Sequence, residues 1–257
     1  MPVIYEPEGK ALEYAPLAVN LYEGCQHGCT YCYAPDVLHK DKAQFIEAKP
    51  RPDIIDRLSK EAPKRPQAGN KASVLLCFTC DPYQPLEDTH MITRRAINIL
   101  HAHGYTVSIL TKGGHRATRD FDLLTDEDLF GTTLTFIDEG DSKLWEPNAA
   151  LPEDRLRALQ IAHDHGIRTW VSLEPVIDPR QTLELISATH EYVDEFKVGK
   201  WNHDNRAQAI DWRKFGNDAI TLLESLGKKY YIKADLKKYL NGAVIENRQR
   251  QERREEA

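Results

Sequence analysis

Short apolar runs rich in β-branched residues recur along the chain, and a longer stretch with helical spacing of its apolar positions follows most of them. This alternation is typical of parallel βα units, in which buried strands are covered by amphipathic helices. We expect six strands, at Leu17–Leu21, Ser73–Phe78, Thr106–Leu110, Gly131–Phe136, Thr169–Leu173 and Glu195–Val198.

Three of the intervening stretches carry helix boundaries that can be recognised in the sequence. Residues 88–103 end before Gly104, residues 152–165 open with Pro-Glu-Asp and end before Gly166, and residues 211–226 end before Gly227. Proline in a first helical turn and glycine just past a last turn are typical helix ends. Six βα units predict an α/β fold, a partial (β/α)6 barrel of the TIM type.

Polar and reactive residues cluster just after the expected strand ends. They include three cysteines within residues 25–32, the segment Thr79–Gln84, the segment Thr111–Gly114, and the dipeptide Glu174-Pro175. In barrels of this kind, the loops after the carboxyl ends of the strands build the active site. We therefore expect these loops to face one another.

The length and composition of the chain limit the number of domains and the kind of protein that we expect. The chain has 257 residues, 41% of them hydrophobic and 29% charged, which suffices for one sizeable core. We expect one domain over residues 1–240 and a charged tail over residues 241–257. No stretch resembles a secretion signal or a membrane span, so we expect a cytoplasmic protein without a membrane partner.

The net charge of −6 gives no global signature of nucleic-acid binding, but it does not exclude a local basic groove. The basic segment from Lys40 to Arg65 is the candidate for such a groove. A solvated helix face and loop is the simpler interpretation of the same residues.

The stretch NLYEGCQHGCTYCYAPD, residues 20–36, holds Cys25, Cys29 and Cys32 in the spacing C-x3-C-x2-C. Clustered cysteines in a reducing compartment are usually metal ligands or redox groups. Zinc would need a fourth ligand, for which His27 and His39 are candidates. An iron–sulfur cube held by three thiolates leaves one iron open to a small molecule.

This motif, with an aromatic residue before its last cysteine and directly after a first strand, resembles the radical S-adenosylmethionine (SAM) superfamily. Further stretches between residues 16 and 200 are similar to the group of spore photoproduct lyase-like, or DNA repair photolyase-like, proteins: CTYCYAPD, TCDPYQPLE, ILTKGGHRATRDFDLL, WEPNAALPEDRLRALQIAHDHGI and EPVIDP. The resemblance implies a partial barrel of the radical SAM type and an enzyme that forms a 5′-deoxyadenosyl radical. It also implies an electron donor of the reductase type.

Carried over by position, the resemblance implies that Cys25, Cys29 and Cys32 ligate one [4Fe-4S] cluster and that Tyr31 lies against the adenine of SAM. Tyr31 and Tyr33 flank the third cysteine, as do the tyrosines thought to relay a radical in the photoproduct lyases. Packing of Tyr33 beneath the loop is the alternative interpretation.

The resemblance also suggests contacts to the remaining parts of SAM. Asp81, Tyr83 and Gln84 lie where superfamily members commonly bind the amino group, and Lys112 is a candidate for the carboxylate. Thr135 is a candidate for the ribose, and Glu174 for cofactor or substrate. For these last two residues, an ordinary structural hydrogen bond is the alternative.

The chain departs from the lyase pattern at the hydrogen-donor cysteine. Phe78 occupies that position, and cysteines stand on either side of it, at Cys77 and Cys80. Cys80, next to Asp81, is our candidate catalytic thiol, with structural packing as the alternative, while Cys77 is expected to be a buried hydrophobe. Two cysteines are too few for a second cube, so we expect one cluster.

The resemblance points to nucleic acid or a nucleotide-like substrate. One alternative is radical modification of a peptide, a protein or a small metabolite. The alternative from another functional class is a zinc or iron–sulfur module without catalysis.

Overall fold

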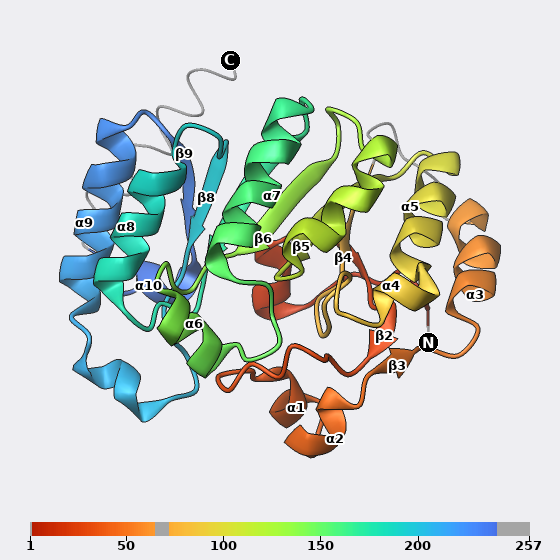
Figure 1. Cartoon of the computed structure of the whole chain (residues 1–257), viewed down its shortest axis with the longest axis horizontal. Helices are drawn as coiled ribbons and strands as arrows, with labels where there is room; N and C mark the ends of the chain where they lie inside the picture. The colour runs from red at the N-terminus through yellow and green to blue at the C-terminus, as the bar shows by residue number, and fades with distance from the viewer. Residues whose placement is uncertain (1, 65–71, 241–257) are drawn as a thin grey trace.

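A sheet of seven parallel strands forms the centre of the molecule (Figure 1), described here by a computed structural model covering residues 2–64 and 72–240. The strands follow one another in the order β1-β4-β5-β6-β7-β8-β9. Their bounds are β1 Leu17–Val19, β4 Ser73–Leu76, β5 Thr106–Thr111, β6 Leu129–Thr133, β7 Arg168–Leu173, β8 Glu195–Val198 and β9 Lys229–Ile232. No pairing joins β1 to β9 among the described residues, so the sheet is an open, partial barrel.

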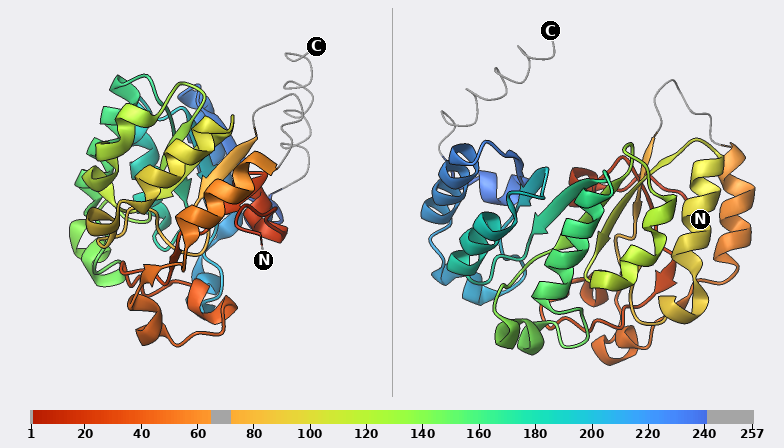
Figure 2. Two further views of the ribbon diagram at one scale, coloured as in Figure 1. Left: turned by 90° about the vertical axis from the view of Figure 1, so that its right-hand side faces the viewer. Right: turned by 45° about the horizontal axis from the view of Figure 1, so that its top comes forward.

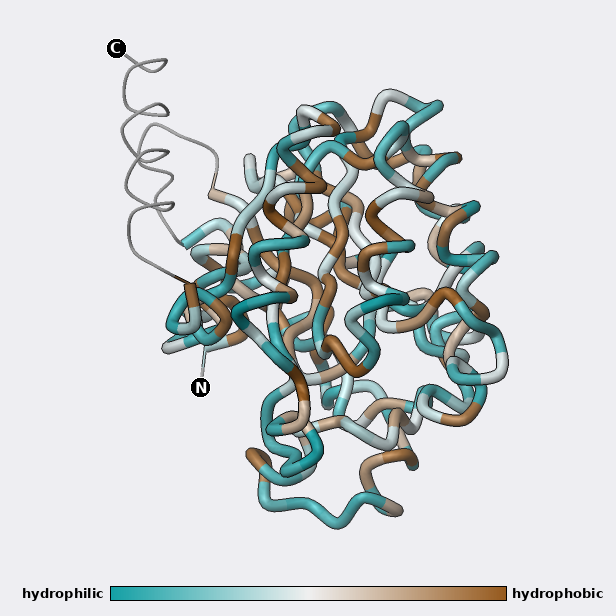
Figure 3. Tube along the Cα trace, turned by 90° about the vertical axis from the view of Figure 1, so that its left-hand side faces the viewer, coloured by the Kyte–Doolittle hydropathy of each residue, from teal (hydrophilic) through white to brown (hydrophobic). Residues whose placement is uncertain are grey.

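Helices cover the outer face of the sheet. The longer ones are α3 Ile54–Glu61, α5 Ile92–Ala102, α7 Pro152–Asp164, α8 Pro179–Thr189 and α9 Trp212–Ser225, with the 3-10 helix η3 Gly114–Leu123 between β5 and β6. The main hydrophobic core lies between these helices and the outward side chains of the strands. Figure 3 shows the hydrophobic residues concentrated along the central strands, with hydrophilic residues on the outer helical turns.

Shorter elements surround the ends of the strands. They are the hairpin β2 Tyr22–Glu23 with β3 Lys49–Pro50, the helices α1 Ala34–Val37, α2 Lys42–Ile46, α4 Glu87–His90, α6 Glu139–Trp145 and α10 Ala234–Lys237, and the 3-10 helices η1 Gly9–Glu13, η2 Ala62–Lys64 and η4 Asn205–Ala209.

The N-terminal segment fills the inner face of the sheet. Tyr5 forms an antiparallel bridge with Ala18 of β1, and η1 then crosses to the opposite end of the sheet. There the Glu13 carboxylate accepts hydrogen bonds from the Tyr231 hydroxyl (2.9 Å) and the Ala234 N–H (2.8 Å). The segment lies on the side of the sheet away from α5 and α7 (Figure 2). The first and last parts of the barrel therefore meet through this segment.

The α/β barrel prediction is confirmed, with three main differences in its elements. A seventh strand, β9, follows the six that were expected, and β6 begins at Leu129 instead of Gly131. The expected helix over residues 88–103 is divided into α4 and α5 at Met91, whose φ is +49°. The buried Glu87 carboxylate accepts the Ile92 and Thr93 N–H groups, which begins a new helix there.

Three expectations concern the periphery of the chain. The tail 241–257 and Arg65 lie outside the described residues. The rest of the basic segment from Lys40 divides mainly among α2, β3 and α3. One face of α3 buries Ile54, Ile55 and Leu58. The segment therefore fits the interpretation of a helix with one solvated face better than that of a continuous basic groove. Within residues 2–64 and 72–240, no helix has the length and apolar character of a membrane span.

Candidate active site

The cysteine loop, between β2 and α1, is held in place by glutamine side chains and by a glycine. The buried Gln84 accepts the Gln26 N–H (2.8 Å), and the Gln26 side chain accepts the Leu86 N–H (2.6 Å). Gly24 has a φ of +83°, and a Cβ there would lie 2.4 Å from the Phe45 carbonyl oxygen. Any other residue would push the loop away from α2.

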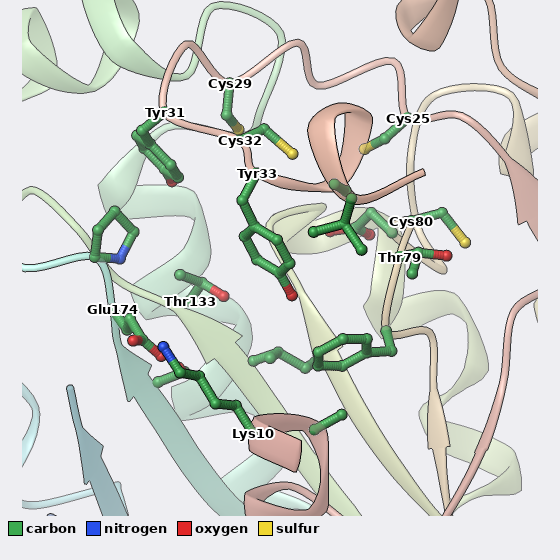
Figure 4. Close-up of a pocket in the computed structure, with 18 of the residues that line it drawn as sticks. Lys10, Cys25, Cys29, Tyr31, Cys32, Tyr33, Thr79, Cys80, Thr133 and Glu174 are labelled. Carbon is green, nitrogen blue, oxygen red and sulfur yellow. The ribbon is translucent and has the colours of Figure 1, made fainter. Parts of the chain in front are cut away.

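The motif cysteines open onto a cavity of about 440 Å³ at the carboxyl ends of the strands (Figure 4). This volume lies within the range of small-molecule sites, roughly 300–1,000 Å³. Cys25, Cys29 and Cys32 line one wall, and Glu174 belongs to the opposite wall. The cavity thus has a cysteine wall and an opposite wall, and these two names are kept below.

Asp81 organises the base of the cysteine wall. Its carboxylate accepts the Tyr83 N–H (2.8 Å), the Thr111 hydroxyl (2.6 Å) and the Lys112 N–H (2.8 Å). His27 Nδ1 lies 3.4 Å from the same carboxylate. Asp81 therefore joins the cysteine loop to the ends of β4 and β5.

Tyr31 is anchored by a buried ion pair that the sequence analysis did not identify. Its hydroxyl donates to Glu146 and lies 3.3 Å from the Thr135 hydroxyl, while Glu146 pairs with Arg155. Burial alone would raise the pKa of Glu146, but Arg155 and Lys112 outweigh it and hold the pKa below its ordinary value. The Lys112 ammonium lies 5.7 Å from the centre of the Tyr31 ring.

The opposite wall contains a second buried ion pair, between Glu174 and Lys233. Lys233 also donates to the Tyr14 and Ser172 hydroxyls, and Asn202 donates to Glu174 (3.1 Å). Burial would lower the pKa of Lys233, but Tyr14 and Glu174 keep it above its ordinary value. This wall therefore carries a fixed charge pair built from distant parts of the chain.

Aromatic rings join the two walls. Tyr33 is stacked on His203, with 6.0 Å between ring centroids, and lies 6.4 Å from Phe78, which in turn contacts Tyr14 edge to face at 5.9 Å. Figure 4 shows Tyr33 extending from the cysteine loop into the cavity and the Cys80 sulfur turned away from it. Tyr33 therefore projects into the cavity instead of packing beneath the loop.

The structure brings most of the predicted site residues to one cavity. Its lining includes the three motif cysteines together with Tyr31, Tyr33, Cys80, Asp81, Lys112 and Glu174. Three candidates lie outside the lining. Tyr83 is fully buried with its hydroxyl on Asp120, Gln84 braces the cysteine loop, and Thr135 contacts the Tyr31 hydroxyl, while Thr133 faces the cavity.

Four functional candidates were missed by the sequence analysis: Glu146, Arg155, Lys233 and Tyr14. Glu146 and Arg155 belong to the stretch WEPNAALPEDRLRALQIAHDHGI, which was noted only for its resemblance. No motif marked Tyr14 or Lys233.

The chemistry of the cysteine wall fits a thiolate-bound cluster. Burial raises the pKa of Cys29 to about 12 and also raises that of Cys25, so both are neutral thiols without a metal, and a cluster bound by them would displace their protons. His27 is 2% exposed and its Nε2 has no partner in the described part of the chain, although the residue lines the cavity. Over the described ranges, no three His, Cys, Asp or Glu side chains converge on one ion position. His39 is exposed and does not line this cavity.

Structural neighbours share this fold. A spore photoproduct lyase mutant with bound AdoMet and dinucleoside spore photoproduct aligns with a TM-score of 0.68 at 15% identity, covering 89% of this chain and 79% of that one. SuiB of Streptococcus suis bound to S-adenosylmethionine aligns with a TM-score of 0.50 at 11% identity, covering 63% of this chain and 39% of that one.

Sequence relatives include the uncharacterized protein MJ0683 of Methanocaldococcus jannaschii, 26% identical over 67% of this chain and 64% of that protein. The uncharacterized protein Rv2578c of Mycobacterium tuberculosis is 26% identical over 66% of this chain and 52% of that protein. The chain thus spans less than two thirds of the length of these relatives.

The family model described as the Radical SAM superfamily matches residues 19–193, which include the cysteine wall and β2 to β7. The chain belongs to the Radical SAM superfamily.

Proposed function

We propose that Cys25, Cys29 and Cys32 hold one [4Fe-4S] cluster and that SAM binds beside it in the cavity. The observation that carries this proposal is the opening of all three motif cysteines onto one cavity of about 440 Å³. With both groups bound and an electron from a reductase-type donor, the site would supply a 5′-deoxyadenosyl radical. The chain itself would bind, orient and shield the reactants.

Residues of the cysteine wall have distinct tasks in this proposal. Lys112 offers an ammonium to the SAM carboxylate, next to Cys29. The Glu146–Arg155 pair fixes the Tyr31 hydroxyl, which sets the angle of the ring that faces the adenine. Asp81 keeps the Lys112 backbone in register with the cysteine loop.

The opposite wall is the substrate side in this proposal, and we infer a nucleic-acid or nucleotide-like substrate. The stacked Tyr33 and His203 rings suit a base, because aromatic faces bind bases by stacking. Lys10 and Lys200 also line the cavity, and their charge suits a phosphate. A structural neighbour bound to a dinucleoside photoproduct supports the same class. Cys80, in the loop after β4, is the candidate hydrogen donor, and its sulfur would have to turn toward the cavity to act.

Anaerobic reconstitution with iron and sulfide, followed by dithionite and SAM, tests the cofactor part. We expect about four irons per chain and formation of 5′-deoxyadenosine, both lost in Cys29→Ala. Cys77→Ala, a cysteine outside the motif, is the matched control and should keep the iron. Zinc without iron in the reconstituted protein would contradict the proposal.

Binding to single-stranded and duplex DNA across a range of salt tests the substrate part. Phosphate contacts predict affinity that falls steeply with salt, and Lys200→Ala should reduce that slope. Undetectable or salt-independent binding would favour a peptide, protein or small metabolite as substrate.

A further inference from the structure

Cys77 and Cys80 form a C-x-x-C pair at the end of β4, separate from the cluster motif. In chains built from βα units, this spacing is typical of thiols that interconvert with a disulfide. Burial, and after it the nearby Cys80, raises the pKa of Cys77, and both residues line the same cavity. The two cysteines are therefore close neighbours in the folded chain.

The two thiols differ in their surroundings. Cys77 is 4% exposed, and its sulfur accepts the Leu21 N–H at 3.4 Å, which fixes its position at the edge of β1. Cys80 is half-buried, at the start of the loop that carries Asp81. An accessible thiol beside a buried, fixed one is the arrangement needed for thiol–disulfide exchange, in which the accessible sulfur reacts first.

We propose that Cys77 and Cys80 are a redox-active dithiol that forms a reversible disulfide with a low-molecular-weight disulfide, such as oxidised glutathione, as oxidant. Cys80 attacks one sulfur of the oxidant and releases one glutathione thiol. Cys77 then attacks the Cys80 sulfur, forms the intramolecular bond and releases the second thiol. The cysteine pair loses two electrons and two protons, which the oxidant gains as two thiols.

This site goes beyond the radical chemistry, because it requires neither the cluster nor SAM. It does affect the same cavity. In the oxidised state Cys80 has no S–H group. Its neighbour in the chain is Asp81, which accepts hydrogen bonds from Tyr83, Thr111 and Lys112, so the new disulfide lies next to the residue that organises the cysteine wall. The redox state of the pair therefore determines whether a thiol is present beside the cysteine wall.

Tryptic mapping tests the dithiol without altering the chain. Cys77 and Cys80 fall in one peptide, residues 72–94, and the motif cysteines fall in another, residues 11–40. Cluster-loaded protein is equilibrated without oxygen in glutathione buffers of stepped ratio, quenched with acid, alkylated and digested. The disulfide appears as the peptide over residues 72–94 without alkyl groups and two hydrogens lighter.

We expect the folded chain to form this disulfide at an oxidant level about tenfold lower than the denatured chain needs, since folding holds the sulfurs together. Dithiothreitol should reverse it, and Cys77→Ala should instead retain a glutathione adduct on Cys80. A reduced peptide at every ratio, a persistent adduct in the wild type, or equal formation in the denatured chain would each overturn the proposal. Iron content is measured in the same samples, so a failure of the cluster proposal can be distinguished from a failure of the dithiol proposal.

Discussion

The two walls of the cavity are built in different ways. The cysteine wall comes from short-range geometry and from loops that follow consecutive strands, tied together by Gln84, Asp81 and the Glu146–Arg155 pair. The opposite wall exists only because Tyr14, from the first residues, and Lys233, directly after the last strand, meet at Glu174. Cofactor geometry thus depends on loop register, whereas the opposite wall depends on the two ends of the barrel coming together.

This difference predicts that the two walls have separate functions. Residues matched by the superfamily model, 19–193, include the whole cysteine wall but neither Tyr14 nor Lys233. A wall that lies wholly within the match suits a shared cofactor, while a wall in which Glu174 meets partners from outside the match suits what is particular to one chain. Variants in the two walls should therefore fail in different assays.

The largest effect is expected for Arg155→Ala. Removing the guanidinium leaves the Glu146 carboxylate buried without its ion pair and also removes the bonds to the Thr133 and Ala150 carbonyls. Breaking a buried pair in this way costs about 3–5 kcal/mol of unfolding free energy. The free energy of unfolding, measured with denaturant, and the iron content of the reconstituted protein should both decrease.

Arg157→Ala is the matched control, because Arg157 is on the same helix and exposed. Surface substitutions usually change stability by less than about 0.5 kcal/mol. If the two variants were equally stable and equally loaded with iron, the Glu146–Arg155 pair would not be what supports the cysteine wall.

The second effect is expected for Glu174→Gln, in the opposite wall. The amide keeps the shape but removes the charge facing Lys233, while Tyr14 and Ser172 still accept from the ammonium. We expect a loss of about 1–2 kcal/mol in stability, full cluster loading, and unchanged 5′-deoxyadenosine formation in the absence of substrate. Binding to DNA should weaken.

Glu184→Gln, an exposed carboxylate on α8, serves as the control for Glu174. A Glu174→Gln protein that lost its iron would show that the opposite wall is not independent of the cysteine wall. Normal DNA binding by that variant would instead remove Glu174 from the substrate site.

The sequence contained enough to predict the fold and the cysteine wall. Six of the seven central strands are apolar runs buried on the sheet, and the cysteine spacing is local, so neither required knowledge of distant contacts. The last strand, Lys229–Ile232, was missed because lysine and two tyrosines leave it without a continuous apolar run, and none of its residues is fully buried. Lys233, which follows it, was missed with it.

Side-chain direction explains the remaining differences. Tyr83 and Gln84 were assigned to the cofactor from their position after β4, but the turn directs both into the interior, to Asp120 and to the cysteine loop. Position in a sequence identifies the loop that a residue belongs to. It does not determine which side of that loop the side chain faces, because this depends on partners such as Gln26 that lie about sixty residues away.

The smallest effect concerns pH and separates the charge of Glu146 from its shape. The pKa of Glu146 is lowered in the folded chain, so its contribution to stability is fully present above the ordinary value of 4.5 and is lost as pH falls through the lowered value. Glu146→Gln should therefore reduce the loss of stability below pH 4.5, by up to about 1.4 kcal/mol per pH unit. Urea unfolding of cluster-free protein between pH 7 and pH 3.5 measures this, with the exposed Glu153→Gln as control. Equal slopes in both variants would mean that Arg155 and Lys112 do not hold Glu146 ionised, and the cysteine wall would then depend on the Gln84, Gln26 and Asp81 hydrogen bonds instead.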